Sequence, residues 1–281
     1  MTSPIKKILF VITGLLLILL GVYLYLNFSE KDEKTLWVNF LDIGQGDAIY
    51  IRTPGDQDIL IDGGPDARVL EGLGKYMPFY DRKIELVILT HGHADHVAGL
   101  NEILKRYEVD LVLYPGDVDY QASDYEAFKE IIAEEDIPLA VATAGQVYQL
   151  GEDLSMDIYF PFADLSGQKM EDINDSSVIS RLVYGDIAFL FTGDAGIEVE
   201  KKLINSEQEL LSNVLKVGHH GSKYSSSEEF IELVDPECGI IQCGVDNDFD
   251  HPHKETLELF EKEGINVLRN DLEGDIVCEA D

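Results

Sequence analysis

The sequence IELVILTHGHADH, residues 84–96, joins an apolar segment to a dense group of histidines. Its first part, Ile84 to Thr90, is mostly apolar and β-branched, which is typical of a strand buried on both faces of a sheet. After the histidines, apolar side chains recur at helical spacing from Val97 to Tyr107. The histidines are therefore predicted to lie at a turn between a buried strand and a helix.

This turn carries four side chains of the kind that bind metals: His91, His93, Asp95 and His96. In an extended segment the i, i+2 spacing of His91 and His93 puts both rings on one side, while Asp95 and His96 open the helix and face a neighbouring point. Two divalent ions about 3.5 to 4 Å apart would suit this arrangement. We predict all four side chains as metal ligands.

The seven histidines of the chain all fall in three short clusters, at residues 91–96, 219–220 and 251–253. Imidazole is the commonest metal ligand in proteins. Since no histidine is used elsewhere, the clusters indicate one shared metal centre and a metalloenzyme.

Two further apolar segments lead to ligand-type side chains. Ile187 to Phe191 predicts a buried strand that ends near Asp194, a candidate bridging ligand, although an Asp after Gly ordinarily only forms a turn. Val214 to Val217 leads to His219 and His220, of which at least one is predicted to coordinate. Adjacent residues on an extended segment point apart, so the other would face substrate or a carboxylate.

The last cluster is His251-Pro252-His253. Pro252 stiffens the segment, and the i, i+2 spacing allows both rings to face one way. Three interpretations stay open: these rings complete the metal site, hold a substrate anion, or form a surface turn.

Taken together, these motifs resemble the metallo-β-lactamase superfamily, whose signature is His-x-His-x-Asp-His. The order of several motifs resembles in particular the hydrolase domain of ComEC-type DNA-uptake proteins, from about Leu36 to the C-terminus. The motifs are LDIGQGDA at 41–48, LIDGG at 60–64, FTGD at 191–194, LKVGHHGS at 215–222 and HPH at 251–253. The resemblance implies an α/β fold, the four-layer αββα sandwich, with the metals at one edge between the sheets.

The resemblance also implies supporting roles. Asp62 is expected beneath the metal site, where it orients a ligand, although Asp-Gly could equally form a hairpin turn. Ser222 and Asp271 are expected to contact substrate or orient a ligand. The family usually has Gly where this chain has Asp250, and Thr where it has Asn270.

One departure concerns the first metal ion. Many superfamily members supply a further histidine before the bridging Asp, yet none occurs between Val97 and Gly218. An oxygen from Asn174 or Asp175 could replace it. Oxygen donors shift the preference from zinc toward manganese, so we expect two divalent ions, Zn or Mn.

Strands are predicted at 37–42, 48–53, 58–62, 84–90, 109–114, 157–160, 178–184, 187–192, 214–217 and 238–242, and helices at 97–107, 125–135, 197–205, 227–234 and 254–263.

The three cysteines are not expected to form disulfides. Cys238 and Cys243 are predicted to lie on opposite faces of their strand and, with Cys278, to be small buried side chains.

An apolar segment precedes this domain. Ile8 to Phe28 carries no charge and follows Lys6 and Lys7, which predicts a transmembrane anchor with a cytoplasmic N-terminus and an extracytoplasmic enzyme. A cleavable signal peptide is the alternative. The predicted organisation is 1–7 cytoplasmic, 8–28 anchor, 29–35 linker and 36–281 hydrolase domain.

Composition argues against a conventional nuclease. The formal net charge is −33, whereas nucleic-acid grooves are usually lined by Lys and Arg. The basic candidates for a phosphate contact are Lys216, Lys223 and Arg181.

We therefore expect a membrane-anchored metal-dependent hydrolase, a phosphodiesterase acting on DNA or another phosphodiester, with Asp95 or Asp194 accepting a proton. The alternatives are hydrolysis of a small ester, lactone or cell-wall phosphoester, and a non-catalytic metal-binding module that serves a DNA-uptake channel. With one membrane segment, this chain is not expected to form such a channel itself.

Overall fold

The computed structural model describes residues 4–29 and 35–281, and the chain divides into two compact units, residues 1–35 and 36–281. The first unit contains helix α1 (Pro4–Ser29). Its segment Lys6–Tyr23 has a mean hydropathy of 2.0, and none of it is buried, so by length and composition it is a candidate membrane span. Residues 1–3 of the predicted N-terminal segment and 30–34 of the predicted linker lie outside the described residues.

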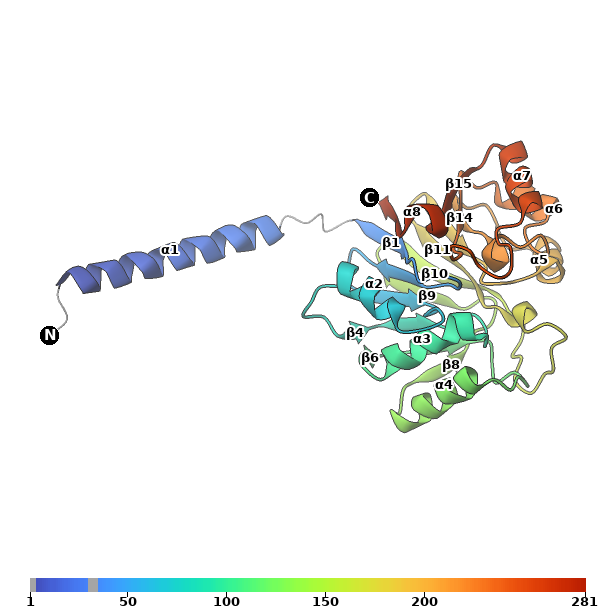
Figure 1. Ribbon diagram of the computed structural model, residues 1–281, viewed down its shortest axis with the longest axis horizontal. Helices are drawn as coiled ribbons and strands as arrows, with labels where there is room; N and C mark the ends of the chain where they lie inside the picture. Colours follow the sequence, from blue (N-terminus) through green and yellow to red (C-terminus); the bar gives the residue numbers. More distant parts are fainter. Residues whose placement is uncertain (1–3, 30–34) are drawn as a thin grey trace. The chain divides into compact units, whose positions relative to one another are not determined.

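The second unit contains two seven-stranded sheets (Figure 1). The first sheet has the order β16 (Ile276–Ala280), β1 (Leu36–Phe40), β2 (Ile49–Arg52), β3 (Asp58–Ile61), β5 (Leu86–Ile88), β7 (Val112–Tyr114), β8 (Leu139–Val141). The second has the order β15 (Asn266–Arg269), β14 (Cys238–Ile241), β13 (Val214–Lys216), β12 (Ile187–Phe191), β11 (Ile179–Tyr184), β10 (Leu154–Phe160), β9 (Val147–Gly151). A separate small sheet pairs β4 (Lys83–Ile84) with β6 (Glu108–Val109).

The facing sides of the two sheets form the central core. Phe40 of the first sheet and Phe191 of the second have ring centroids 6.3 Å apart, and both belong to one buried apolar cluster with Ile88 and Met156. Burial of each such side chain is worth roughly 1.5–3 kcal/mol relative to exposure. The alternating apolar pattern of the strands therefore drives the two sheets together.

Helices cover both outer faces. The first sheet is covered by α2 (Arg68–Tyr76), α3 (Ala94–Leu104) and α4 (Ser123–Glu134), and the second by α5 (Ile197–Ile204), α6 (Glu228–Val234) and α7 (Lys254–Glu263). A short helix α8 (Asn270–Glu273) and two 3₁₀ turns, η1 (Ile173–Ser176) and η2 (Gly218–Gly221), complete the unit. Each helical layer has its own apolar cluster against its sheet. The predicted four-layer αββα sandwich is confirmed.

Two predicted strands are each divided in two. The strand expected at 84–90 breaks at Glu85, whose carboxylate accepts a hydrogen bond from the backbone of Asp58 at 2.7 Å, and the strand expected at 109–114 breaks into β6 and β7. The first halves pair with each other in the small sheet. The strand prediction was right in type and wrong in continuity.

The topology gathers the loops that carry the ligand-type residues. Strands β3, β5 and β7 run parallel in the first sheet, and β12, β13 and β14 run parallel in the second. The loops that follow β3, β5, β12 and β13 carry Asp62, the 91–96 cluster, Asp194 and His219–His220. Their side chains meet between the two sheets.

Candidate metal centre

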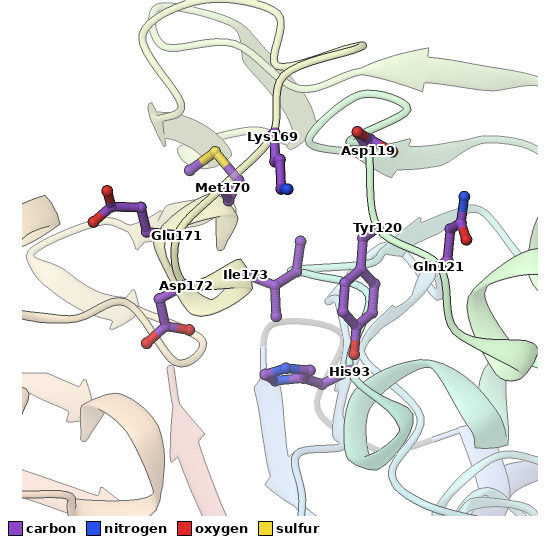
Figure 2. Close-up of a pocket in the computed structure, with 9 residues that line it drawn as sticks. All are labelled: His93, Asp119, Tyr120, Gln121, Lys169, Met170, Glu171, Asp172 and Ile173. Atoms are coloured by element: carbon purple, nitrogen blue, oxygen red, sulfur yellow. The ribbon is translucent and has the colours of Figure 1, made fainter.

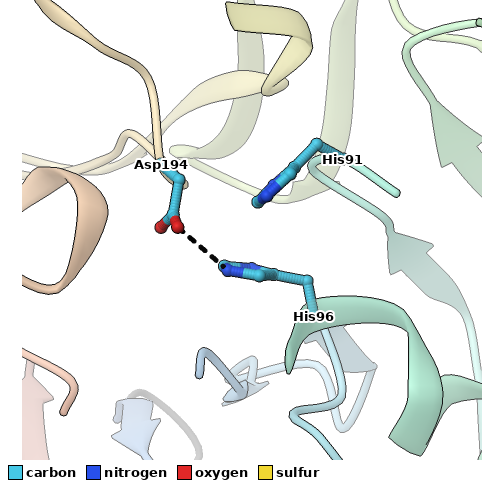
Figure 3. Close-up of side chains that lie close together, drawn as sticks. All are labelled: His91, His96 and Asp194. Atoms are coloured by element: carbon cyan, nitrogen blue, oxygen red, sulfur yellow. Dashed lines mark ion pairs between the residues drawn. The ribbon is translucent and has the colours of Figure 1, made fainter. Parts of the chain in front are cut away.

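Asp194 and two buried histidines form the first ligand group. Donor atoms of His91, His96 and Asp194 all lie within 4.8 Å of one another, and the Nε2 atom of His96 is 3.3 Å from Oδ2 of Asp194 (Figure 3). All three residues are buried. The strand β12 and the turn after β5 therefore deliver a carboxylate and two imidazoles to one point.

A second group shares Asp194. The Nε2 atom of His220 lies 3.2 Å from Oδ2 of Asp194 and 3.4 Å from Oδ2 of Asp95, and donor atoms of Asp95, His96 and His220 also lie within 4.8 Å of one another. Asp194 thus stands between the two groups. This is the position that a bridging ligand between two ions would take.

His93 extends the first group toward solvent. Its Nδ1 atom is 3.0 Å from Nε2 of His91, and its side chain is only partly buried. The two ring nitrogens therefore point at a common place, as the i, i+2 spacing predicted.

Asp62 orients the rings of His96 and His91. Its Oδ2 atom lies 2.8 Å from Nδ1 of His96 and accepts a hydrogen bond of 2.6 Å from the Thr90 hydroxyl, which in turn lies 3.1 Å from Nδ1 of His91. A carboxylate that accepts from Nδ1–H leaves Nε2 free for a cation. The hairpin alternative is wrong, because β3 pairs in parallel with β5 and no hairpin follows it.

The loop of His219 and His220 differs from the expectation of an extended segment. Both residues have left-handed backbone angles, with φ of 47° and 54°, within the 3₁₀ turn η2. As a result the two rings do not point apart: Nε2 of His219 lies 4.0 Å from the same Asp194 oxygen that His220 approaches. The Nδ1 atom of His220 is 2.8 Å from the Gln242 carbonyl, which fixes that ring.

The 251–253 segment closes one side of the site. The His251 ring centroid lies 5.4 Å from that of His219 and 6.0 Å from that of His220, whereas Nδ1 of His253 accepts a hydrogen bond of 3.3 Å from the Lys223 backbone. A plain surface turn is therefore wrong for His251. Asp250 adopts φ of 57°, so it takes the left-handed conformation for which the family's usual glycine is suited.

Asn174 lies where an oxygen donor is needed. It is buried in η1, its Nδ2 atom is 3.5 Å from Nε2 of His219, and its Oδ1 atom has no hydrogen-bond partner among the described residues. The side chain of Asp175 instead lies toward the start of α5, at Gly196. Of the two oxygen donors that the sequence offered, the geometry favours Asn174.

Two other predicted site residues, Ser222 and Asp271, form hydrogen bonds or ion pairs with residues that are not predicted metal ligands. The Ser222 hydroxyl accepts a hydrogen bond of 3.3 Å from the Tyr224 backbone, so it stabilises the loop. Asp271 forms an ion pair with Arg269 and accepts from Cys243 at 3.4 Å. Neither set of contacts supports the role at the metal centre that the resemblance implied.

Two of the three predicted phosphate contacts are wrong. Lys216 is completely buried, forms an ion pair with Asp47 and donates to the Gly193 carbonyl at 3.0 Å. Arg181 donates to the Leu211 carbonyl at 2.7 Å. Lys223 is exposed beside the 251–253 segment and stays available.

Asp47 is a site residue whose role the sequence did not define. It is buried, contacts Lys216, and its Oδ1 atom lies 3.3 Å from Nδ1 of His220. The preceding Gly46 permits this approach, since a Cβ atom there would lie 2.1 Å from the Asp95 carbonyl. The sequence feature that could have revealed this role is the position of Asp47 directly after the glycine-rich turn Gly44-Gln45-Gly46.

The donor set fits divalent cations. Buried atoms without a hydrogen-bond partner among the described residues include Nε2 of His96, Nε2 of His220 and Oδ1 of Asp194. Buried polar atoms left unpaired cost about 1–3 kcal/mol each. Divalent cations held among these side chains would give the two imidazole nitrogens a partner.

Electrostatics agree with this fit. Burial lowers the pKa of His91, His93 and His219, which keeps these rings neutral and able to donate a lone pair. Burial also opposes the charge on His96 and His220, but the neighbouring Asp194 carboxylate raises the pKa of both rings well above the usual range. The carboxylates thus create a strongly negative point that favours a cation.

The comparison with known families decides the identity. Residues 41–245 match the Metallo-beta-lactamase superfamily. The chain belongs to the metallo-beta-lactamase superfamily. In this chain donor atoms of His91, His96 and Asp194, and of Asp95, His96 and His220, lie together.

Relatives named as competence proteins, of the ComEC type, are similar to most of this chain. The chain is 32% identical over 272 residues to ComE operon protein 3 of Bacillus subtilis (strain 168), covering 91% of this chain and 34% of that protein. It is 29% identical over 248 residues to Competence protein ComA of Neisseria gonorrhoeae, covering 88% of this chain and 32% of that protein. The chain therefore spans about a third of the length of these relatives. A more distant match, 22% identical over 164 residues, is Exodeoxyribonuclease YycJ of Bacillus anthracis, covering 55% of this chain and 61% of that protein.

Solved structures show the same fold. CmlA, a diiron beta-hydroxylase from Streptomyces venezuelae, aligns with a TM-score of 0.56 at 14% identity over 87% of this chain and 54% of that one. Zn²⁺-bound PqqB from Methylobacterium extorquens aligns with a TM-score of 0.53 at 12% identity over 83% and 87% of the two chains.

Proposed function

We propose that this metallo-beta-lactamase-fold protein is a membrane-anchored phosphodiesterase that cleaves DNA outside the cytoplasm. The observation that carries the proposal is the position of Asp194 between two groups of nitrogen and oxygen donors, each with a buried histidine. The names of its relatives, two competence proteins and an exodeoxyribonuclease, favour DNA as the phosphodiester.

We assign two divalent ions, Zn or Mn, to these donors. His91, His93 and Asp194 would hold the first, with His219 or Asn174 in place of the histidine that other members supply. Asp95, His96, Asp194 and His220 would hold the second. When bound, such ions lower the pKa of water and stabilise charge on phosphoryl oxygens.

Asp95 is the better of the two candidate proton acceptors. Its side chain is 30% exposed, whereas that of Asp194 is 2% exposed between two histidines. A group that takes a proton must reach the reacting water, and Asp95 faces the open side of the site. His251 lies beside the rings of His219 and His220, and His253 contacts the backbone of the exposed Lys223; these three side chains would contact the phosphate or the leaving group.

The direct test is cleavage of DNA by the full chain in detergent, with Mn²⁺ and Zn²⁺ compared. Single-stranded and double-stranded DNA, bis-p-nitrophenyl phosphate and a p-nitrophenyl ester serve as substrates. Asp95→Ala is the active-site variant and Asp66→Ala, an exposed Asp paired with Arg68, is the matched control. Cleavage of DNA by wild type and by Asp66→Ala, but not by Asp95→Ala, is the expected result.

The other outcomes separate the alternatives. Hydrolysis of the small ester without hydrolysis of either phosphodiester would replace the proposal by a small-molecule hydrolase, which the acidic composition suits. Bound metal with no turnover on any substrate would instead support a metal-binding module of a DNA-uptake assembly.

The membrane part of the proposal rests on α1 and on Lys6 and Lys7 at its start. The chain should stay with membranes at alkaline pH, and protease added to intact cells should remove a C-terminal epitope. Release by alkali would contradict the anchor, and protection of the epitope would contradict the extracytoplasmic location.

A further inference from the structure

A pocket of about 350 Å³ opens beside the first ligand group. Figure 2 shows His93 at its base, with Tyr120 extending toward His93 on one side and Ile173 on the other, while Lys169 lies above them. The Tyr120 and His93 ring centroids are 5.7 Å apart in an edge-on arrangement. Since His93 lies 3.0 Å from His91, a molecule in this pocket lies next to the proposed reaction centre.

The walls of the pocket are built before any ligand arrives. Val118, Leu165 and Ile173 form a separate small buried cluster, against which Tyr120 and Met170 pack. Backbone hydrogen bonds also join the two walls, from Asp119 to Gln168 at 3.0 Å and from Gly167 to Asp117 at 2.8 Å. The shape of the pocket is therefore a property of the fold.

The chemistry of the pocket does not suit a phosphate. Its lining includes three carboxylates, Asp119, Glu171 and Asp172, and one cation, Lys169. Asp172 is partly engaged, because it accepts a hydrogen bond from the Asn174 backbone at 3.0 Å. The remaining carboxylates are hydrogen-bond acceptors beside the apolar faces of Tyr120, Met170 and Ile173.

An aromatic ring with amino groups matches this lining. Every nucleobase has a face that stacks on an aromatic side chain, and carboxylates accept hydrogen bonds from exocyclic amino groups such as N4 of cytosine. Thymine lacks such an amino group. In a duplex both faces of a base are stacked on its neighbours, so only an unpaired base could place its face on Tyr120.

We propose that this pocket binds the unpaired base next to the scissile phosphate, with Tyr120 as the stacking platform. The preferred substrate is then single-stranded DNA that carries cytosine, adenine or guanine at that position in place of thymine. This inference rests on the proposed phosphodiesterase function and adds to it a preference for single-stranded DNA and for the base beside the cleaved bond.

The test uses the full chain in detergent with Mn²⁺ and oligo-dT strands that carry one dC, one dT or one abasic residue at a fixed position. Wild type should cleave beside dC about tenfold faster than beside dT, which can stack but has no amino group for the carboxylates, and than beside the abasic residue, which can do neither. Tyr120→Leu should lose this preference and Tyr120→Phe should keep it. Tyr80→Leu, at a tyrosine that is 74% exposed, is the control and should behave as wild type.

Inhibition of bis-p-nitrophenyl phosphate hydrolysis gives a second readout that needs no DNA cleavage. We expect dCMP to inhibit at about tenfold lower concentration than dTMP or deoxyribose 5-phosphate, and Tyr120→Leu should abolish this difference whereas Tyr80→Leu should keep it. Hydrolysis of the small phosphodiester without any base preference would overturn the pocket assignment alone. Failure to hydrolyse any phosphodiester would overturn the proposed function and the pocket together.

Discussion

Backbone conformation at single residues decides which histidines meet Asp194. His219 and His220 are consecutive residues with positive φ, a conformation that non-glycine residues adopt rarely and that costs of order 1–3 kcal/mol where it is strained. Sequence reasoning assigned this segment to extended backbone and predicted diverging rings. The spacing of residues could not reveal a turn that brings both rings to one carboxylate.

Asp62 offers a test at this scale, because it contacts His96 directly and His91 through Thr90. Asp62→Ala should weaken metal binding about 10- to 100-fold, the usual effect of removing a carboxylate that orients a ligand histidine. Isothermal titration with Zn²⁺ measures this affinity, and Asp66→Ala is the exposed control. An unchanged affinity in Asp62→Ala would contradict the orienting role.

Lys216 stabilises the fold and does not contact substrate. It is fully buried and paired with Asp47, and Lys216→Met leaves that carboxylate buried without its cation. Removing one partner of a buried pair destabilises a protein by about 3–5 kcal/mol. Denaturant unfolding should show this loss, while Lys201→Met, which removes an exposed pair with Glu198, should change stability by less than about 1 kcal/mol. Equal stability of the two variants would mean that the buried pair contributes nothing.

At the scale of elements, long apolar segments were predictable and edge elements were not. The central strands β12 and β14 have apolar sequences, β13 is apolar up to Lys216, and all three were predicted from sequence. In contrast, β9 is largely exposed and β16 lies at a sheet edge, so their apolar patterns are weak. Helix α2 was missed because it contains Gly72 and Gly74, which have poor helix propensity; Gly72 lies against the side chain of Leu41.

Three cysteines test the packing around β14 and β16: Cys238 in β14, Cys243 just after that strand, and Cys278 in β16. Cys238 packs in the cluster between the sheets, and Cys243 packs on the helical side, which confirms their predicted opposite faces. Burial raises the pKa of Cys243 and of Cys278 to about 12. In the native chain at about pH 8 we therefore expect little reaction with a disulfide reagent such as DTNB, and reaction of all three thiols in guanidinium.

The same pKa shifts have a consequence for stability. Between the ordinary thiol value of 9.0 and the folded value of about 12, the unfolded chain loses protons that the folded chain keeps, so stability should fall as pH rises through this window. Cys243→Ala should make that decline shallower. Rapid labelling of Cys243 in the native chain would contradict its burial.

At the scale of the whole molecule, the charge of −33 sets the response to salt. Basic nucleases lose affinity for DNA as salt rises, because their cations replace counterions. This chain should do the opposite: its kcat/KM on DNA should rise between about 20 mM and about 150 mM NaCl as repulsion is screened, while kcat/KM on neutral p-nitrophenyl esters, if any are cleaved, should stay level. A fall with salt on DNA would indicate an undetected basic binding surface.

Sequence predicted the overall site better than its internal contacts. The histidine clusters and Asp194 were found because they follow buried strands whose ends meet in this fold. The side-chain directions of Lys216 and Arg181 were not predictable, since each depends on a partner distant in sequence, Asp47 for Lys216 and Leu211 for Arg181. The pocket at Tyr120 was missed for the same reason, because its two walls lie about 50 residues apart in the chain.

We propose that Asp194 would bind both of two metal ions in a phosphodiesterase site. Metal content by inductively coupled plasma mass spectrometry, measured with hydrolysis of bis-p-nitrophenyl phosphate on the same samples, tests it most directly. Wild type should carry about two divalent ions per chain, and Asp194→Ala should lose metal and hydrolysis together. Full metal content and full hydrolysis in Asp194→Ala, or an active wild type without bound metal, would contradict the account.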